Sequence, residues 1–529
     1  MIPQSPIWWL TQLHRRLMVR APRVRMYEEY YDGLHPLSFV TTEYRQEFAT
    51  MLRGVSDNWM ALVVDAVEER LHVEGFRMGD DPAGDKDAWR IWQENCLDAD
   101  SEMLHSTALQ TGSAFVMVWF GGDDQPEITV VHPGQCFVAY ENGTQRKRAA
   151  AIKSWVDEWT GDVRANVYLP DGIYKFQSKR AITLDEYRTD SGRDRRLEVL
   201  GAMWKPLDDE YVDNPLGVVP IVEFRNRPRL LGEGRSEIAD VISVQNQINK
   251  LVCDMMVAAE FSAFKQRWAT GVEIPTDPVT GKPLQAYASA VDRLWSVESD
   301  TARFGEFGES NLGNYVAALE NRVQSLASRT RTPPHYLLGS SGSFPSGESL
   351  KATETGLIAK CRSRHRHFGE SWEEVMRLAF AVLDDRRSEA RMAETIWTDP
   401  ESRSEAEHTD SLLKKMSLGV PVRQLWEDAG YSQTQIDRFG DMLVAEAEQR
   451  ARIAEADHGP EHELSEAELL AKLVPAVDVI VTPDEARNIV GLPAGFVKPE
   501  APKPAQVRRT IERDASGKAV GMIEEPVGA

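Results

Sequence analysis

Apolar and polar residues follow one another along this chain with periods that change from stretch to stretch. Up to about residue 95 the period is helical, with apolar side chains at positions 59, 62, 63, 66, 67 and 71 on one helix face. From about residue 115 to 225 the period falls to two, β-forming residues dominate, and turn signals such as GGDDQP, ENGT and PDG separate the segments. We therefore expect an α+β fold, mainly helical, with an antiparallel β module in its N-terminal half.

Two later stretches repeat apolar residues at alternating intervals of three and four. The first begins near Ser236, a suitable N-cap residue, and continues to about Phe264; the second runs from about Leu312 to Thr330. The first series includes Ile238, Val241, Ile248, Val252 and Met255, and the second includes Leu319, Val323 and Leu326. Because a segment rich in Gly and Pro separates them, the pattern predicts a helical hairpin with a small insert at its tip.

A Gly/Ser-rich segment, residues 331–349, ends the second helix with two prolines, and a long apolar series then predicts a helix from about residue 350 to 384. This helix contains the basic run CRSRHRH, with Arg362, Arg364 and Arg366. Two interpretations of the run stay open. The first is a solvated face or ion pairs to acidic neighbours such as Glu370, Glu373 and Glu374, and the second is a positive band that faces phosphates. Shorter helices follow residue 397, and the composition loosens after about residue 457.

The charge balance bears on the kind of partner. Lys and Arg number 61 and Asp and Glu number 83, a formal net charge of −22 over 529 residues. A protein that grips nucleic acid neutralises phosphates with basic residues, so this balance argues against a conventional DNA-binding protein but leaves room for one that handles DNA without holding it. Five arginines near the N-terminus form a basic arm suited to an acidic neighbouring subunit or to nucleic acid: Arg15, Arg16, Arg20, Arg23 and Arg25.

Length and composition predict a folded protein of several units. The length suggests three or four units of roughly 100–200 residues each, and 42% apolar with 27% charged residues exclude wholesale disorder. No apolar run approaches the roughly 20 residues of a membrane helix, and the N-terminal basic residues follow the apolar ones, the reverse of a secretory signal. We therefore expect no membrane partner and a cytoplasm-like compartment.

Catalytic motifs are scarce. The chain has no GxxxxGK[ST] phosphate loop, no GxSxG elbow and no HExxH helix, and Gly232 and Gly234 lack the rest of a dinucleotide-binding pattern. The four cysteines are widely scattered, so we expect four buried thiols and neither a disulfide nor a zinc site. Acidic pairs such as Asp123 and Asp124 leave a metal-dependent nuclease open as an alternative, although no third ligand is apparent. We predict no catalytic residue, no metal and no cofactor.

Several phrases occur in a characteristic order: YYDGLHPL, NWMALVVDAVEERLHVEGFR, NPLGVVPIVEFRNRP, GEGRSEIADVISVQNQINKLVCDMM, TPPHYLLG with FPSGESLKATE, and WEEVMRLAF. In this combination, over roughly residues 25–450, the chain resembles the portal proteins of long-tailed (siphophage-type) bacteriophages. Portal proteins form a ring, expected to be a dodecamer, at one capsid vertex around a central DNA channel. The resemblance implies a structural, non-catalytic function in genome packaging, retention, ejection and head–tail joining. Besides the metal-dependent nuclease, another capsid-associated connector or scaffold protein is an alternative.

The family plan of wing, stem, clip, tunnel loop and crown implies a division of the chain. Residues 1–234 would form the N-terminal wing with the β module, 235–265 and 309–330 the two stem helices, 266–308 the clip, 331–349 the tunnel loop, 350–396 the long wing helix, 397–456 the helical wing and crown, and 457–529 a partly disordered C-terminal extension. The apolar series of the stem would be the contact between subunits, because a long seam needs a neighbour along its length. The tunnel-loop candidates for facing DNA are His335, Ser341, Ser343, Phe344, Ser346 and Lys351.

The resemblance also implies partners and a location. Besides other copies of itself, the chain would contact double-stranded DNA without sequence preference, a terminase packaging motor, a head–tail adaptor and the major capsid protein. It would be found in the virion at the portal vertex, and in the host cytoplasm during assembly. An acidic channel wall would let DNA slide without sticking, with the repulsion screened beyond about 8 Å at physiological salt.

Overall fold

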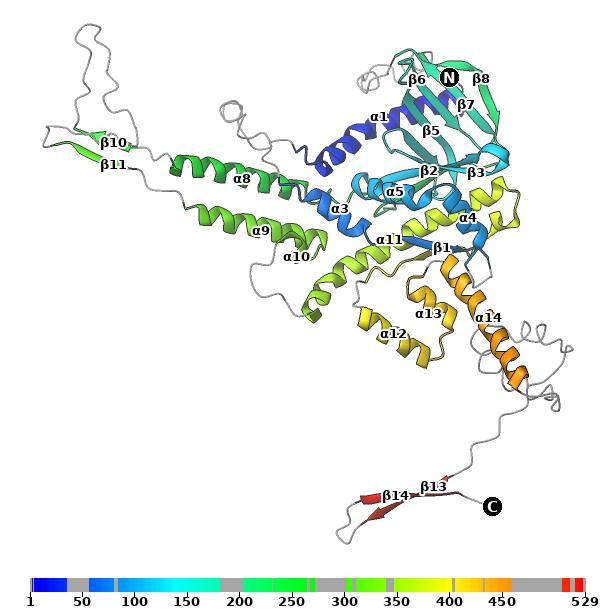
Figure 1. Ribbon diagram of the computed structural model, residues 1–529. Helices are drawn as coiled ribbons and strands as arrows, with labels where there is room; N and C mark the ends of the chain where they lie inside the picture. Colours follow the sequence, from blue (N-terminus) through cyan, green and yellow to red (C-terminus); the bar gives the residue numbers. More distant parts are fainter. Residues whose placement is uncertain are drawn as a thin grey trace, which may run out of the picture. The chain divides into compact units, whose positions relative to one another are not determined.

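The structure of the chain is a computed structural model (Figure 1) that describes residues 2, 4–35, 57–79, 84–180, 203–230, 232–263, 267–271, 301–306, 311–338, 347–401, 405–431, 433–457, 507–513 and 519–526. The chain divides into two compact units, Met1–Leu412 with Glu427–Ile436, and Leu413–Trp426 with Asp437–Ala529. Within the described ranges, no helix has the length and apolarity needed to span a membrane.

The predicted β module consists of two antiparallel sheets. One has five strands in the order β4 (Cys136–Tyr140), β5 (Arg148–Val156), β6 (Val163–Tyr168), β7 (Gly172–Ser178) and β8 (Lys205–Asp213). The other has three strands in the order β3 (Pro126–Val131), β2 (Ser113–Phe120) and β9 (Ile221–Arg225), with the 3-10 helix η1 (Gly122–Asp124) between β2 and β3 in the sequence. The period of two predicted every one of these strands except β8, whose sequence KPLDDEYVD has few β-forming residues.

The five-stranded sheet is covered on both faces. Helix α1 (Pro6–Tyr31) lies on one face, where its Leu13 packs in the same core as Phe137 of β4. The three-stranded sheet lies on the other face, where Phe115 of β2 packs in the same core as Val138 of β4. Successive residues of β4 therefore point into different cores, as the pleat of a strand requires.

The N-terminal basic arm is part of α1, and one of its arginines is buried. Arg20 is 5% exposed and donates hydrogen bonds to the carbonyl oxygens of Pro133 (2.5 Å) and Cys136. This arginine joins α1 to the turn before β4, so the prediction that it meets a partner is wrong. The other four arginines of the arm are at least partly exposed: Arg15, Arg16, Arg23 and Arg25.

The largest hydrophobic core joins the three-stranded sheet to α3 (Met60–Glu68), α4 (Lys86–Glu94), α5 (Leu97–Thr111) and α11 (Gly347–Val382). The predicted apolar stripe near residues 59–71 enters this core through α3. Helix α11 is the long helix expected after residue 350, and its Trp372 packs edge-to-face on Trp92 of α4, with 4.7 Å between ring centroids. The 3-10 helix η2 (Arg386–Glu389) follows α11.

One segment expected to be helical is a strand. Strand β1 (Val73–Arg77) pairs antiparallel with β12 (Glu394–Trp397). Arg77 and Glu394, whose side chains form an ion pair at 2.8 Å across the two strands, are 317 positions apart in the sequence. A five-residue strand with so distant a partner gives no local signal of its own.

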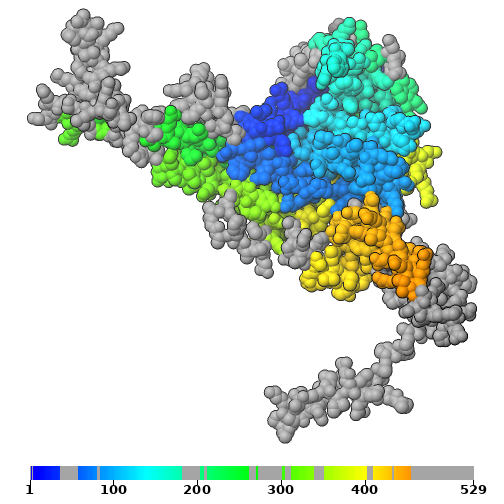
Figure 2. Space-filling view, viewed as in Figure 1, coloured from blue at the N-terminus to red at the C-terminus, as the bar shows by residue number. Residues whose placement is uncertain are grey.

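The predicted helical hairpin is present. Helices α8 (Ile242–Ala263) and α9 (Leu312–Thr330) pack side by side (Figures 1 and 2), and β10 (Arg267–Thr270) and β11 (Arg303–Glu306) pair antiparallel in the insert between them. Residues 272–300 of the insert lie outside the described residues. Helix α8 begins six residues later than predicted, because residues 236–241 form turns in which the Ser236 hydroxyl accepts a hydrogen bond from the Ile238 N–H (3.2 Å).

The short helix α10 (Pro334–Leu337) precedes the long helix α11, and the remaining elements follow it. The expected short helices are α12 (Glu405–Ser417), α13 (Val422–Asp428) and α14 (Gln433–Asp457), which contribute to both units. Within the second unit, Trp426 and Phe439 pack edge-to-face with ring centroids 5.5 Å apart. Strands β13 (Val507–Arg513) and β14 (Ala519–Pro526) pair antiparallel near the C-terminal end.

Candidate functional site

The paired helices α8 and α9 continue the largest core of the chain. Near that core, Ile248 of α8 and Leu326 of α9 are fully buried. A hydrogen bond from Arg322 of α9 to Gln247 of α8 (3.3 Å) joins the two helices at their surface. This end of the pair is therefore fixed by the chain's own packing.

Five of the eight residues of the predicted seam between subunits lie inside the chain itself. Ile238, Val241 and Ile248 are 0% exposed and belong to the core that contains α3 and α11. At these positions the neighbour that the apolar series requires is the same chain. The other members of the series are also described: Val323 and Leu326 are buried in this core, Val252 and Leu319 pack against its edge, and Met255 is half-buried away from it.

The outer half of α8 carries more apolar surface than its own chain covers. Between Leu251 and Ala259, Asp254 is the only charged residue, yet Cys253 is the only side chain in that interval that is buried. A helix that is apolar on all sides is normally buried on all sides. On α9, Val316 is likewise 47% exposed. This part of the pair is therefore suited to contact with another polypeptide.

A buried ion cluster, defined by Glu237, Lys360 and Arg364, anchors the base of α8 to α11. Glu237 accepts hydrogen bonds from Nε (3.1 Å) and Nη2 of Arg364 and forms an ion pair with Nζ of Lys360 (3.0 Å). Lys360 also donates a hydrogen bond to the carbonyl oxygen of Thr330, the last residue of α9 (3.1 Å). The buried ion cluster therefore connects the segment before α8, the end of α9 and the middle of α11.

Close backbone packing holds the segment that carries Glu237. Asn226 Nδ2 donates hydrogen bonds to Glu237 Oε1 (2.9 Å) and to the carbonyl oxygen of Arg235 (2.8 Å). Gly234 lies so close to Gly112, at the end of α5, that a Cβ atom on Gly234 would be 1.8 Å from the Gly112 carbonyl oxygen. Gly234 is thus required by this contact, which accounts for a glycine that no nucleotide-binding motif explains.

The electrostatics of the buried ion cluster favour the ionised carboxylate. Burial by itself raises the pKa of Glu237, but the charges of Lys360 and Arg364 outweigh burial and lower the pKa from 4.5 to about 2. The carboxylate pairs with both cations and balances one of their two positive charges. Its removal would leave two positive charges in the interior without a counter-charge.

The predicted basic band is not a single face of α11. Arg364 is buried in the ion cluster, whereas Arg366 is exposed. Arg362 is exposed too, with its Nη2 atom 3.9 Å from Asp399 and 3.8 Å from Glu401. Ion pairing, the first of the two interpretations, therefore describes Arg362 and Arg364, although their partners lie outside α11.

Glu237 and Lys360 were not among the predicted site residues, and only part of the cluster has a signal in the sequence. Arg364 falls in the apolar series of α11, between Cys361 and Phe368, where a charged residue must be paired if the face is buried. The partner comes from a segment 127 positions earlier, so its identity follows from the fold alone.

Two of the tunnel-loop candidates are described. His335 lies in α10, with its Nε2 atom 3.9 Å from Glu354 of α11, and Lys351 is exposed near the start of α11. The other four lie outside the described residues: Ser341, Ser343, Phe344 and Ser346. Their contact with DNA stays a prediction.

The described residues offer little to redox or metal chemistry. No group of three or more His, Cys, Asp and Glu side chains in that part of the chain could hold a metal ion. The expectation of four buried thiols is wrong for Cys96, which is exposed at the start of α5, while Cys136, Cys253 and Cys361 are buried. Cys96 has a φ of 54°, a left-handed conformation that turns the chain between α4 and α5.

The chain is similar to several known proteins. A family model described as phage portal protein, SPP1 Gp6-like, matches residues 13–438. The portal protein of Mycobacterium phage L5 is 26% identical over 461 residues, covering 81% of this chain and 88% of the relative. The portal protein of Mycobacterium phage D29 is 28% identical over 394 residues, covering 70% of this chain and 75% of the relative. Among solved structures, a chain from the virion of the native gene transfer agent (GTA) particle aligns with a TM-score of 0.34 and 11% identity, covering 84% of this chain and 94% of that chain.

The matched range of this chain, residues 13–438, contains the β module, the paired helices, the buried ion cluster and α11. The family model and the two curated relatives favour a portal protein over a metal-dependent nuclease. The chain belongs to the SPP1 Gp6-like family of phage portal proteins and is a structural, non-enzymatic component of a bacteriophage virion.

Proposed function

We propose that copies of this chain close into a ring, a dodecamer, at one vertex of the capsid, and that double-stranded DNA passes through the ring when the genome is packaged and ejected. In this proposal the ring also retains the packaged DNA and joins the head to the tail. The protein acts as a passage, with no bond made or broken.

The observation that carries the proposal is the outer half of α8. Its apolar residues, including Met255 and Val257, are only half-buried in a single copy. In a ring each subunit has a neighbour on both sides through a contact that joins two different surfaces. A neighbouring copy would cover this part of α8, while the buried ion cluster holds the base of the helix to its own chain.

The family plan supports a role for each region of the structure. The pair α8 and α9 is the proposed stem, and the insert that contains β10 and β11 is the proposed clip, which would contact a terminase packaging motor and later a head–tail adaptor. Residues 331–349 are the proposed tunnel loop, and the body that contains the two sheets and α11 is the proposed wing, which would contact the major capsid protein.

The charge of the chain suits a channel through which DNA moves. At a net charge of −22 per copy, phosphates meet a predominantly negative protein. Carboxylates near the axis would repel the DNA backbone over about 8 Å at physiological salt and so keep it from sticking. Contact with DNA would be independent of base sequence.

The substitution Met255→Asp tests whether the outer half of α8 is a contact between copies. A charge buried in the contact would weaken each subunit interaction by about 3 kcal/mol or more, which is over a hundredfold. We expect native mass spectrometry at micromolar protein to find rings for the wild type and monomers for Met255→Asp, with unchanged circular dichroism.

The matched control is Met392→Asp, since Met392 is 76% exposed and lies away from the paired helices, just before β12. This variant should form rings as the wild type does. Rings of unchanged stability from Met255→Asp would show that the outer half of α8 is not the contact.

A further inference from the structure

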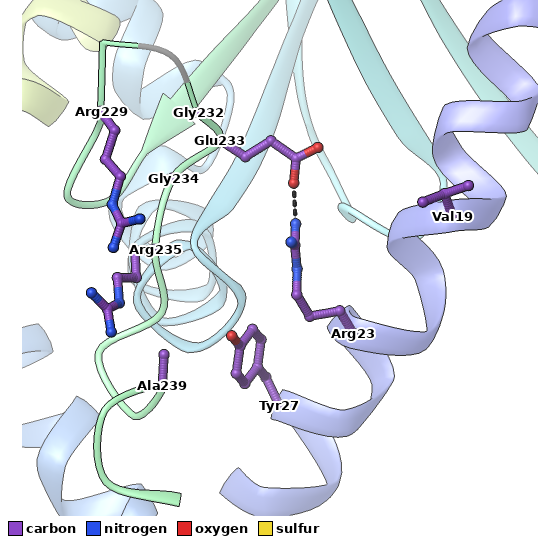
Figure 3. Close-up of a pocket in the computed structure, with 9 residues that line it drawn as sticks. All are labelled: Val19, Arg23, Tyr27, Arg229, Gly232, Glu233, Gly234, Arg235 and Ala239. Atoms are coloured by element: carbon purple, nitrogen blue, oxygen red, sulfur yellow. Dashed lines mark hydrogen bonds and ion pairs between the residues drawn. The ribbon is translucent and has the colours of Figure 1, made fainter.

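A groove runs along α1 on the side that faces the segment between β9 and α8. It consists of three adjoining pockets of about 520, 440 and 290 Å³, and Glu233 lines all three. Figure 3 shows the largest of these three pockets, with Val19, Arg23 and Tyr27 on α1 at one side and Arg229 and Arg235 on the opposite segment. Glu233 on that segment and Arg23 point toward each other across the opening and form an ion pair.

The groove is basic in a protein that is strongly acidic as a whole. Two glutamates, Glu223 and Glu233, line it, against six arginines: Arg15, Arg16, Arg23, Arg225, Arg229 and Arg235. Glu233 and Glu223 already pair with Arg23 and Arg225, and Asp240 pairs with Arg235. Within the described part of the chain, Arg15, Arg16 and Arg229 form no ion pair with a carboxylate, so the groove keeps an excess of positive charge.

The guanidinium groups on the segment before α8 are crowded together. Arg227 and Arg229 lie near Arg235, and after burial their positive charges are the next causes that lower the pKa of Arg235. Among the described residues, Asp240 is the one carboxylate that pairs with these arginines: it pairs with Arg235 and with Arg227 (3.2 Å). Additional carboxylates from outside would relieve this repulsion and accept charge-assisted hydrogen bonds.

Apolar side chains also line the groove. Phe137, Val138 and Tyr140 of β4 line one pocket, and Val19 of α1, which is 60% exposed, lines the other two. Bare phosphate groups would gain nothing from these apolar side chains and would meet the two glutamates. A protein surface that presents carboxylates beside apolar side chains matches both the arginines and the apolar lining.

We propose that this arginine-lined groove docks an acidic face of the neighbouring copy in the ring, an inference that rests on the ring proposed above. The groove cannot meet its own equivalent, because arginines would then face arginines. It must meet a different surface, which is the arrangement that a closed ring of more than two copies requires. With 83 acidic against 61 basic residues per chain, the surface that a neighbour offers is predominantly negative.

Charge reversal in the groove tests the inference. The double variant Arg16→Glu with Arg229→Glu changes two groove arginines that have no carboxylate partner among the described residues, so the internal ion pairs stay intact. The control, Arg386→Glu with Arg391→Glu, makes the same change of charge at two exposed positions outside the groove. Light scattering and native mass spectrometry would give the protein concentration at which half of the chains are in rings.

We expect the groove variant to need a concentration at least roughly tenfold higher than the control at 0.1 M salt, where the Debye length is about 10 Å. The difference should largely disappear at 1 M salt, where the Debye length is about 3 Å. Equal assembly of the two variants, or a defect that salt does not relieve, would overturn the inference while the ring stands. A wild type that forms no ring would overturn the proposed function and the inference with it.

A second measurement identifies the occupant of the groove. The variant Arg229→Lys keeps the charge and supplies an amine that a carbodiimide joins directly to a contacting carboxylate. In rings assembled from equal amounts of ¹⁴N and ¹⁵N chains, we expect cross-linked peptides that pair a light Lys with a heavy acidic residue. Cross-links confined to one chain would contradict the proposal, as would a groove variant that assembles normally but no longer binds a 30-base-pair duplex.

Discussion

The substitution Glu237→Ala tests the buried ion cluster that ties the paired helices to the body. It removes the carboxylate that faces Lys360 and Arg364, each of which is 7% exposed. A carboxyl group whose pKa falls from 4.5 to about 2 on folding contributes on the order of 3 kcal/mol at neutral pH. Breaking a buried pair by removal of one partner costs about 3–5 kcal/mol. The two estimates agree, and we expect the free energy of unfolding to fall by about 3–5 kcal/mol.

Urea unfolding at pH 7, followed by circular dichroism, measures this loss. The protein concentration must be the same for every variant, because assembly into rings would add to the apparent stability. The control is Glu29→Ala on α1, which removes the partner of Arg25 in an exposed pair (2.9 Å) four residues apart. Such a pair contributes about 0.5 kcal/mol or less. A loss for Glu237→Ala no greater than that for Glu29→Ala would refute the burial of Glu237 between two cations.

Acid should weaken the same cluster. Because folding lowers the pKa of Glu237, its stabilisation is complete above pH 4.5 and is lost as the pH falls from 4.5 towards 2. The variant Glu237→Gln cannot titrate, so its unfolding free energy should depend less steeply on pH in this window than that of the wild type. Parallel pH profiles would contradict the assigned ionisation of Glu237.

Three further predictions concern other parts of the molecule. Ile248→Asp should unfold the chain or destabilise it by more than about 3 kcal/mol, unlike Met255→Asp, since Ile248 is 0% exposed in a single copy; a folded monomer of wild-type stability in urea would place Ile248 outside the core. Burial lowers the pKa of His105 from 6.5 to about 3, so the stability that its neutral form contributes should be lost as the pH falls from 6.5 towards 4, by up to about 3 kcal/mol. The variant His105→Gln can still accept a hydrogen bond from Trp372 Nε1 (2.9 Å in the wild type), and its unfolding free energy should depend less on pH in that range. Equal pH dependence of the two proteins in urea unfolding would contradict the burial of a neutral His105. Deletion of residues 340–346 should leave rings intact in native mass spectrometry but impair DNA packaging or retention, and normal infectivity of the phage would speak against a tunnel loop there.

Local periodicity predicted those elements whose apolar faces recur within a few residues. The period of two found the strands β2 to β7 and β9, and the intervals of three and four gave α9 its observed bounds, Leu312–Thr330. The start of α8 was misplaced because Ser236 looks like a helix cap by sequence, whereas the buried Glu237 beside it belongs to an ion cluster made by distant residues. Strand β1 was missed for the same reason, since its partner β12 is remote in the chain.

Periodicity does not identify which neighbour covers an apolar face. The series from Ile238 to Met255 needs a partner along its length, but the sequence does not distinguish a second copy from the chain's own core. The structure covers Ile238, Val241 and Ile248 internally and leaves Met255 half-buried. In the same way, Arg20 looked like part of an exposed basic arm, and only the fold brings it to the carbonyl oxygens of Pro133 and Cys136.

The central claim is that many copies surround an open axis. Electron cryo-microscopy of the purified full-length protein tests it most directly. The account predicts ring-shaped particles of twelve subunits with an axial hole wide enough for duplex DNA, and with the outer half of α8, Leu251 to Ala259, covered by the adjacent copy. Single particles in which one chain covers that half of α8 by itself, or rings without an open axis, would contradict it.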